Sequence, residues 1–295
     1  MKELFSVVIT TCNRQVNILK EAIDSVINQS YSNIEIIIVN DSPNNPNNSY
    51  IKRMVSSYGN KVQYFVNKKQ MGANYSRNFG AKVSKGQYLS FLDDDDYWDE
   101  NRIEKFWHVF QKHYDLVFSD FIIFCKKKTR YSKRINPKHS ETLKTMLSTN
   151  FLGGFSNVAF TRSCFIKAGM LDESMPSYQD QDLFIRMIQH GKIGYINEPL
   201  SYYRITEGSI SLNPINKING LKMFLEKYSD FYNMYPESKK TRLENELVYS
   251  IKQGWISNKN EIKSILLHYD SRIRVLYLEV IGAAKWIAVN VFKLM

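Results

Sequence analysis

Cysteine pairs, glycine-rich loops and long apolar runs are all scarce in this sequence. Its three cysteines, Cys12, Cys125 and Cys164, are far apart and form no C-x-x-C pair, which argues against a disulfide framework and fits a reducing cytosol. The apolar run that follows Met1 is too short for a signal peptide, and there is no stretch of about 20 uninterrupted apolar residues that would form a membrane-spanning helix. We therefore expect a cytoplasmic protein.

Two nucleotide-binding patterns are also missing. The turn after the first predicted strand reads Thr10-Thr11-Cys12-Asn13-Arg14 and holds no glycine. A dinucleotide-dependent oxidoreductase would need a G-x-G-x-x-G fingerprint there. A sugar-1-phosphate nucleotidyltransferase would want a glycine-rich, arginine-bearing phosphate loop at the same place, so that function is a less favoured alternative.

Basic residues outnumber acidic ones, 40 against 29, which gives a formal charge of +11. Such a chain favours an anionic partner, for example a phosphorylated small molecule, a nucleic acid or an acidic lipid surface. No nucleic-acid recognition motif occurs, and the four consecutive acids at 93–96 would repel a nucleic-acid backbone. We expect no nucleic-acid partner.

The first 100 residues alternate between strand and helix patterns. Short apolar or β-branched runs predict strands at 6–11, 35–39, 62–66 and 87–92, with helical spacing between them. Strands that are apolar almost throughout are typical of a sheet covered on both faces. The order predicts an α/β fold with a mostly parallel, Rossmann-like sheet flanked by helices.

The regular alternation of strand and helix patterns ends after the first 100 residues. Seven basic residues and no acid lie between Asp120 and Glu141, and we interpret this run as an exposed, mobile loop that is either solvated or in contact with a phosphate-bearing acceptor or an acidic membrane. From about residue 215 the pattern predicts a C-terminal helical extension, 215–295. Its apolar end, 275–295, is expected to be a packed terminal helix or a helix lying on a bilayer surface.

Four acidic residues, Asp93 to Asp96, directly follow the strand predicted at 87–92. Their like charges repel one another, and a divalent cation would remove that repulsion. Carboxylate oxygens suit Mg²⁺ or Mn²⁺, which also binds phosphate oxygens of nucleotides. Because open α/β sheets bind ligands at the carboxyl ends of their strands, the row predicts a metal site, with a solvated acidic turn as the alternative.

Three further segments carry weaker signals. Asp41 follows the strand at 35–39 and would either accept a hydrogen bond from a base or form an Asx turn. Gly72 permits a sharp turn before a helix whose Arg77 would contact a phosphate or form an ordinary salt bridge. Asp180 and Asp182 lie near the start of another predicted helix, where an acid either stabilises the helix or acts as a general base.

Taken together and in this order, these segments resemble glycosyltransferase family 2, a group of inverting enzymes with the glycosyltransferase A-type fold. The matching segments are the first strand and turn at 6–14, the strand ending in a uridine-contacting acid at 36–42, the Gly-x-x-x-x-Arg-Asn-x-Gly segment at 72–80, the Asp-x-Asp metal turn at 91–98 and the catalytic-base stretch at 168–182. The resemblance covers roughly residues 4–210.

The resemblance implies a catalytic domain at 1–214, with a nucleotide and metal half at about 1–100 and an acceptor half at about 101–214. Asp180 would be the catalytic base, and Asp95, with Asp93, would hold Mn²⁺ or Mg²⁺. The implied nucleotide-sugar site comprises Thr10, Thr11, Asn13, Arg14, Asp41, Gly72, Arg77, Asp93 and Asp94. On the acceptor side we expect Gln179, Asp182 and Trp98.

The expected function is metal-dependent, inverting transfer of a hexosyl unit from a nucleotide-diphosphate donor, with UDP favoured, to a lipid-linked or oligosaccharide acceptor. The setting would be bacterial surface polysaccharide synthesis, with peripheral contact at the cytoplasmic face of the membrane. Asn40 and Gln179 replace acids that are usual in the family, and the Gln-x-x-Arg-Trp motif of processive members is absent, which favours one sugar per encounter. A non-catalytic nucleotide-sugar-binding protein is the second alternative.

Overall fold

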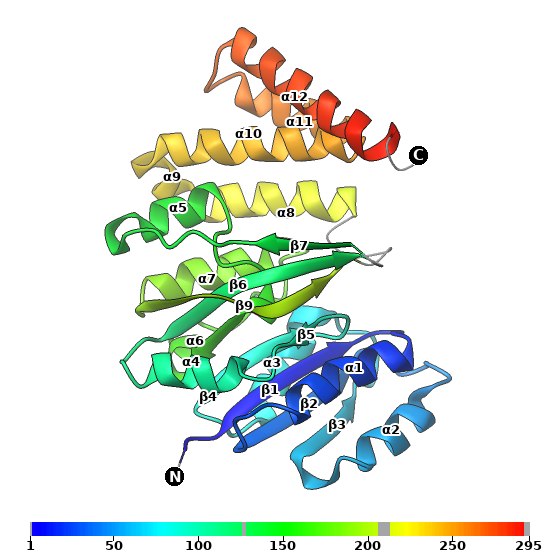
Figure 1. The fold of residues 1–295 in the computed structure, drawn as a ribbon. Coiled ribbons are helices and arrows are strands. Elements are labelled where there is room, and N and C mark those ends of the chain that lie inside the picture. Colours follow the sequence, from blue (N-terminus) through cyan, green and yellow to red (C-terminus); the bar gives the residue numbers. More distant parts are fainter. Residues whose placement is uncertain (1, 126–127, 206–212, 292–295) are drawn as a thin grey trace. The chain divides into compact units, whose positions relative to one another are not determined.

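The computed structural model describes residues 2–125, 128–205 and 213–291, and the chain divides into two compact units (Figure 1). Unit 1 comprises residues 1–136, 151–174 and 179–207, and unit 2 comprises residues 137–150, 175–178 and 208–295. Two short segments that precede residue 208 therefore fold with the C-terminal helices.

A single sheet forms the centre of unit 1, in the strand order β3-β2-β1-β4-β8-β6-β9-β5, with β7 paired to β6. Its strands are β1 (Phe5–Thr11), β2 (Ile34–Asn40), β3 (Val62–Val66), β4 (Tyr88–Asp93), β5 (Tyr97–Trp98), β6 (Leu116–Cys125), β7 (Lys128–Ser132), β8 (Val158–Thr161) and β9 (Ile193–Arg204). The first four strands pair in parallel, whereas β8 is antiparallel to both β4 and β6. The parallel sheet predicted for the first 100 residues is confirmed.

Helices cover both faces of this sheet. They are α1 (Val16–Ile27), α2 (Asn48–Ser56), α3 (Ala73–Val83), α4 (Arg102–Phe110), α6 (Arg162–Lys167) and α7 (Gln179–Ile188), with short 3₁₀ turns at Gly59–Lys61 and Phe155–Asn157. Side chains alternate between the faces of a strand. Val7 and Ile9 accordingly join a core with α1, α2 and α4, whereas Val8 lies against Gly80 of α3. Burial on both faces explains why β1 and β2 are apolar almost throughout.

An aromatic cluster brings α6 and α7 to the α3 side of the sheet. Phe91 of β4 is paired in register with Val8 of β1, so both side chains point to that side. The Phe91 ring contacts the rings of Phe155 and Phe165, and Phe155 in turn contacts Phe184 of α7. The segment predicted to carry the base therefore packs over the same face as α3.

Unit 2 is helical. Its helices are α5 (Thr142–Ser148), α8 (Pro214–Lys227), α9 (Ser229–Met234), α10 (Pro236–Lys252), α11 (Ile256–Leu266) and α12 (Arg272–Val291), with a 3₁₀ turn at His139–Glu141. Helix α10 contacts α5, α11 and α12. Its Arg242 donates hydrogen bonds to the carbonyls of Met146 and Leu147, at the end of α5. The expected C-terminal helices are present, and no helix within the described ranges has the length and apolar content needed to cross a bilayer.

The basic run after β6 is a strand over part of its length, and the prediction of a loop was wrong there. Residues Lys128–Ser132 form β7, antiparallel to β6 over Phe121–Cys125, while Lys126 and Lys127 lie outside the described residues. The sequence of β7 contains no apolar alternation that would predict a strand. It is extended because β6 supplies backbone partners along one side, a long-range effect that outweighs local propensity.

Candidate active site

Three strand ends meet at one edge of the sheet. Thr10 of β1 is in register with Val39 of β2 and with Asp93 of β4, and Thr11 is in register with Asn40. The polar residues that follow these three strands therefore lie at one edge, which is where open α/β sheets bind ligands. The first two turns are also joined directly, since the Ser42 hydroxyl donates to Oδ1 of Asn13 over 2.7 Å.

Asp41 fixes the start of α3. Its buried carboxylate accepts hydrogen bonds from Nδ2 of Asn67 at 2.7 Å and from the backbone amides of Met71 and Gly72 at 2.8 Å. Gly72 has a φ of +92°, a conformation that favours glycine, and α3 begins at the next residue. A carboxylate has about four acceptor positions, so three bonds to the protein leave capacity for one more donor such as a base N–H.

Asn40, which replaces an acid usual in the family, forms hydrogen bonds that hold the loop after β2 in place. Its side-chain amide donates to Oδ1 of Asn48 and to the Tyr64 hydroxyl, and its oxygen accepts from the amide of Ser42. An asparagine supplies both a donor and an acceptor here, whereas an ionised aspartate would only accept.

Arg77 connects α3 to the acidic turn. Its Nη2 atom lies 2.6 Å from Oδ1 of Asp93, and its guanidinium lies 4.5 Å from the ring centre of Phe155. The Nε and Nη1 atoms of this buried side chain have no hydrogen-bond partner among the described residues. The geometry matches the salt-bridge interpretation of Arg77 and gives it a role in orienting Asp93.

Two other arginines bind the acidic turn. Arg14 lies 2.8 Å from Oδ1 of Asp94 and 3.0 Å from Oδ2 of Asp95. Arg204 donates from Nε to the Asp95 carbonyl and from its backbone amide to Oδ1 of Asp96, both at 2.9 Å. Arg14 and Arg204 come from distant parts of the chain, so the repulsion that a divalent cation was expected to remove is already partly relieved by the protein.

The four acids differ in accessibility. Burial raises the pKa of Asp94 to about 6, with Arg14 opposing the shift. Burial also raises the pKa of Asp96 well above its ordinary value, and the charges of Asp93 and Asp95 raise it further. Asp93 and Asp95 have 33% and 16% of their side chains exposed, whereas Asp94 has 8%. The more exposed pair therefore has Asp-x-Asp spacing, while the alternate acids are built into the turn.

A metal at this turn would depend on its nucleotide partner. Within the described part of the chain, no three His, Cys, Asp or Glu side chains gather as a metal-binding cluster. In nucleotide sites, however, Mg²⁺ usually binds one or two carboxylates and takes its other oxygens from phosphates and water. Asp93 and Asp95 fit such a metal, one that arrives with a diphosphate.

The segment before Asp180 is fastened to α3. Nδ2 of Asn74 donates to the Asp172 carbonyl, and Nδ2 of Asn78 donates to the Leu171 carbonyl, each at 2.9 Å. Asp180 itself is half-buried at the start of α7, and its Oδ1 accepts from the amide of Gln181 at 2.8 Å. Sequence reasoning missed Asn74 and Asn78, although Asn78 follows Arg77 in the Gly-x-x-x-x-Arg-Asn-x-Gly segment. Helix α3 thus touches all three segments predicted to form the site.

Two residues expected on the acceptor side belong to the fold instead. Asp182 is completely buried and lies 2.6 Å from Nη2 of Arg186, whose Nη1 donates to the Met170 carbonyl. Trp98 is also buried, donates to the Ser156 carbonyl and lies 3.9 Å below the Arg102 guanidinium. Because the polar groups of both side chains are bound within the fold, the structure gives no support for placing them on the acceptor side. Gln179 remains half-buried at the start of α7.

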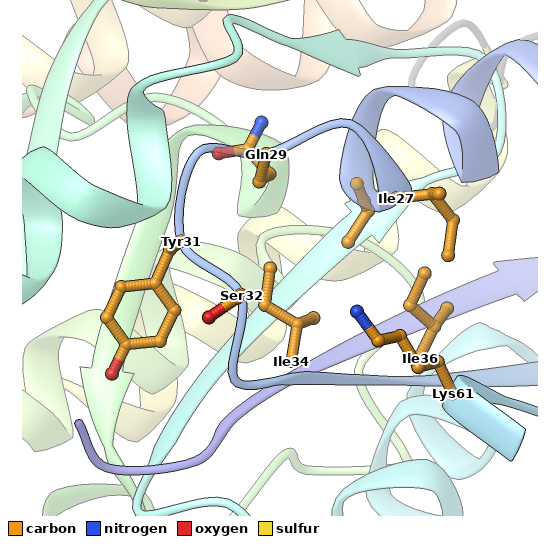
Figure 2. Close-up of a pocket in the computed structure, with 8 residues that line it drawn as sticks. Ile27, Gln29, Tyr31, Ser32, Ile34, Ile36 and Lys61 are labelled. Atoms are coloured by element: carbon orange, nitrogen blue, oxygen red, sulfur yellow. The ribbon is translucent and has the colours of Figure 1, made fainter. Parts of the chain in front are cut away.

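A separate pocket lies at the opposite end of β2 (Figure 2). It has a volume of about 100 Å³, and Ile34, Ile36, Gln29 and Lys61 are among the residues that line it. Ile34 begins β2, whereas Asn40 ends it. This pocket is therefore distinct from the acidic edge.

Comparisons with known proteins agree with this geometry. The model of the family described as Glycosyl transferase family 2 matches residues 6–170, more than half of the chain. An uncharacterized glycosyltransferase from Haemophilus influenzae is 29% identical over 235 residues, which are 76% of this chain and 77% of the relative. A protein of Escherichia coli K12 named "Putative colanic acid biosynthesis glycosyl transferase WcaA" is 28% identical over 240 residues, which are 78% of this chain and 83% of the relative.

Solved structures show the same fold. The crystal structure of S. aureus TarS 1-349 in complex with UDP-GlcNAc has a TM-score of 0.63 and 16% identity, over 97% of this chain and 88% of that one. Another TarS structure has a TM-score of 0.62, and there this chain spans 55% of the longer one. The predicted α/β fold of the glycosyltransferase A type is confirmed, and the chain belongs to glycosyltransferase family 2.

Proposed function

We propose that this protein is an inverting, metal-dependent glycosyltransferase that moves a hexosyl unit from a nucleotide-diphosphate donor, with UDP favoured, to an acceptor hydroxyl. The observation that carries the proposal is the position of α3. Gly72, immediately before the helix, donates to Asp41, Arg77 of the helix binds Asp93, and Asn74 and Asn78 bind the loop before Asp180. The acid proposed to contact the base, one acid of the proposed metal turn and the loop before the proposed general base are thus all fastened to α3 or to the turn that precedes it. The UDP-GlcNAc complex of TarS supports the choice of donor.

Asp95 and Asp93 would hold Mn²⁺ or Mg²⁺ together with the donor diphosphate. The metal, when bound, offsets the negative charge that develops on the leaving phosphate oxygens. Arg14 and Arg77 keep the two carboxylates oriented before the donor arrives, and a preorganised charge costs little rearrangement during the reaction. Asp41 would read the base through its remaining acceptor capacity.

Asp180 would accept the proton of the acceptor hydroxyl. The oxygen would then attack the anomeric carbon from the side opposite the diphosphate, which inverts the configuration. General-base help of this kind contributes about 10²–10⁴-fold to the rate. One sugar would be added per encounter.

The acceptor would be a lipid-linked intermediate or an oligosaccharide of bacterial surface polysaccharide synthesis, presented at a membrane. The name of WcaA and the basic character of the chain support this class of acceptor.

A donor screen tests the proposal. Melting temperatures would be measured with UDP-, GDP- and dTDP-sugars, each with and without Mn²⁺, because a ligand that binds only the folded state raises the melting temperature. We expect the largest rise with a UDP-sugar and Mn²⁺ together, followed by transfer of that sugar to acceptor lipid extracts. Absence of any rise with all of these donors would refute the proposed function.

A further inference from the structure

One face of α12 carries large apolar side chains that are exposed. Ile273, Leu276, Tyr277, Val280 and Ile287 have between 49% and 82% of their surface accessible. At about 100° per residue, these positions fall within an arc of about 100° along the helix. The exposed apolar residues therefore form one continuous stripe, which we call the α12 stripe.

The other side of α12 is already packed within unit 2. Val275 and Leu278 are buried, and Gly282 lies so close to α10 that an added Cβ would be 2.7 Å from Cβ of Ile251. A helix that only filled a core would expose polar residues on its outer side. Packing in unit 2 thus accounts for one face of α12 and leaves the α12 stripe unexplained.

The charges around the stripe are basic. Glu279 is paired with Lys259 and Lys263, and Glu244 is paired with Arg274. Arg272 and Lys285 are exposed and have no acidic partner among the described residues. Unit 2 contains 15 Lys and Arg residues and 9 Asp and Glu residues, so its formal charge is 15 − 9 = +6.

We propose that the α12 stripe docks onto the surface of an anionic lipid bilayer, with α12 lying in the plane of the interface. An apolar stripe flanked by cations is the pattern of interfacial helices, which gain from both apolar burial and attraction to anionic headgroups. The helix lies on the bilayer without crossing it, in keeping with its length and polarity. A second copy of the chain is a poorer occupant, because two units that each carry +6 would repel one another.

This docking site deepens the proposed function and rests on it in one respect, the presentation of the acceptor at a membrane. The binding itself requires neither donor nor acceptor. It is therefore measured separately from sugar transfer.

Flotation of the full chain with lipid vesicles tests the inference. We expect the protein to float with vesicles of phosphatidylglycerol and phosphatidylcholine, and much less with phosphatidylcholine alone. Replacing two stripe residues together, Leu276→Gln and Val280→Gln, should lower the partition coefficient at least about 10-fold, because burial of each such side chain contributes roughly that factor. Arg272→Gln with Lys285→Gln should remove the preference for the anionic vesicles.

Ile256→Gln is the control, because Ile256 is an apolar residue of α11 outside the stripe and is at least as exposed as Leu276 and Val280. Its partition should equal that of the unchanged protein. Equal flotation of the Leu276/Val280 variant and the unchanged protein would overturn the inference. So would a concentration-dependent dimer that the same variant abolishes while vesicles bind neither protein, since this outcome assigns the stripe to a second copy.

Donor binding is measured on the same samples by thermal shift. Donor binding without vesicle binding overturns the docking site and leaves the proposed function intact. Vesicle binding without donor binding overturns the proposed function and leaves the docking site intact.

Discussion

The Nη2 atom of Arg77 lies 2.6 Å from Oδ1 of Asp93, so an acid of the predicted metal turn is held by a helix that starts beside Asp41. A loop alone would leave that carboxylate free to rotate. The contact couples the end of the site proposed to bind the nucleoside to the end proposed to bind the diphosphate.

Arg77→Lys tests this coupling. Lysine keeps the charge but lacks the planar group that both binds Asp93 and lies over Phe155, so the two contacts are not retained together. We expect donor affinity in the presence of Mn²⁺ to fall by about 10-fold, the effect of losing roughly one charge-assisted hydrogen bond. Isothermal titration calorimetry measures this donor affinity. Arg53→Lys, an exposed arginine of α2, is the control and should bind as the unchanged protein does.

Asp95→Ala should abolish the Mn²⁺-dependent part of donor binding, because this carboxylate is the proposed direct ligand. Calorimetric titrations of a UDP-sugar with and without Mn²⁺ should give the same weak affinity for the variant. Asp230→Ala removes an exposed acid from α9 and controls for the change in net charge. An affinity for Asp95→Ala that still depends on Mn²⁺ would exclude this assignment.

Asp180 and Asp182 lie two residues apart in α7 and should respond oppositely to the same substitution. Asp180→Asn should keep donor affinity and stability but lose transfer by at least about 10²-fold, because it removes the general base. Asp182→Asn breaks the buried pair with Arg186 and should lower the free energy of unfolding by about 3 kcal/mol. Urea unfolding and transfer assays on both variants separate the roles. Loss of donor affinity in Asp180→Asn would contradict the base assignment.

Cys12 should report on donor binding if the donor lies beside the 10–14 turn. Its exposed thiol lies in the 10–14 turn, whereas Cys164 is buried and its pKa is raised to about 12 by that burial. Partial loss of solvation, with the charges of Asp41 and Asp94, raises the pKa of Cys12 as well. Its labelling should therefore accelerate as the pH rises toward that pKa and more thiolate forms.

With N-ethylmaleimide and peptide mass spectrometry, we expect Cys12 to react and Cys164 to remain unmodified in the folded protein. A UDP-sugar with Mn²⁺ should slow the reaction at Cys12. Cys125, at the end of β6, is the internal control and should label at the same rate with or without the donor. Protection of Cys125 to the same degree would mean that the donor effect is not local to the 10–14 turn.

Gly80→Ala should destabilise the protein. An added Cβ would lie 2.4 Å from Cγ1 of Val8, so α3 would have to move away from the sheet. Overpacking of this kind costs about 1–3 kcal/mol, which urea unfolding can resolve. Gly154→Ala is the matched control, since no atom lies within 4 Å of its added Cβ. If both variants are equally stable, the close contact of α3 with β1 has been overestimated.

The sheet and the strand-end position of the acids could be predicted from the sequence because both depend on local patterns. Runs such as Ile36–Val39 show a buried strand directly, and the acids after Leu92 are adjacent in the chain. The partners of those acids could not be predicted in the same way. Arg204 donates to the carbonyl of Asp95 across 109 residues, and no local pattern encodes such a contact.

Residue type alone was also a poor guide where burial decides what a side chain does. Trp98 and Asp182 flank predicted functional residues and have side chains suited to ligand binding, yet both are buried. Whether such a residue faces a ligand or the core depends on which helix covers it. For Asp182 that information arises only when Phe155 and Phe184 bring α7 against the sheet, and for Trp98 only when Arg102 of α4 packs on its ring.

Strand β7 pairs with β6 along one side, and among the described residues no strand pairs with its other side. An open strand edge is a template for a neighbouring molecule to extend the sheet. Here that edge carries Lys128 and Arg130 at exposed positions, and two approaching copies would bring their cations together. We therefore expect the basic residues of β7 to oppose edge-to-edge pairing of two copies, and neutralising them should shorten the lifetime of the protein in concentrated solution.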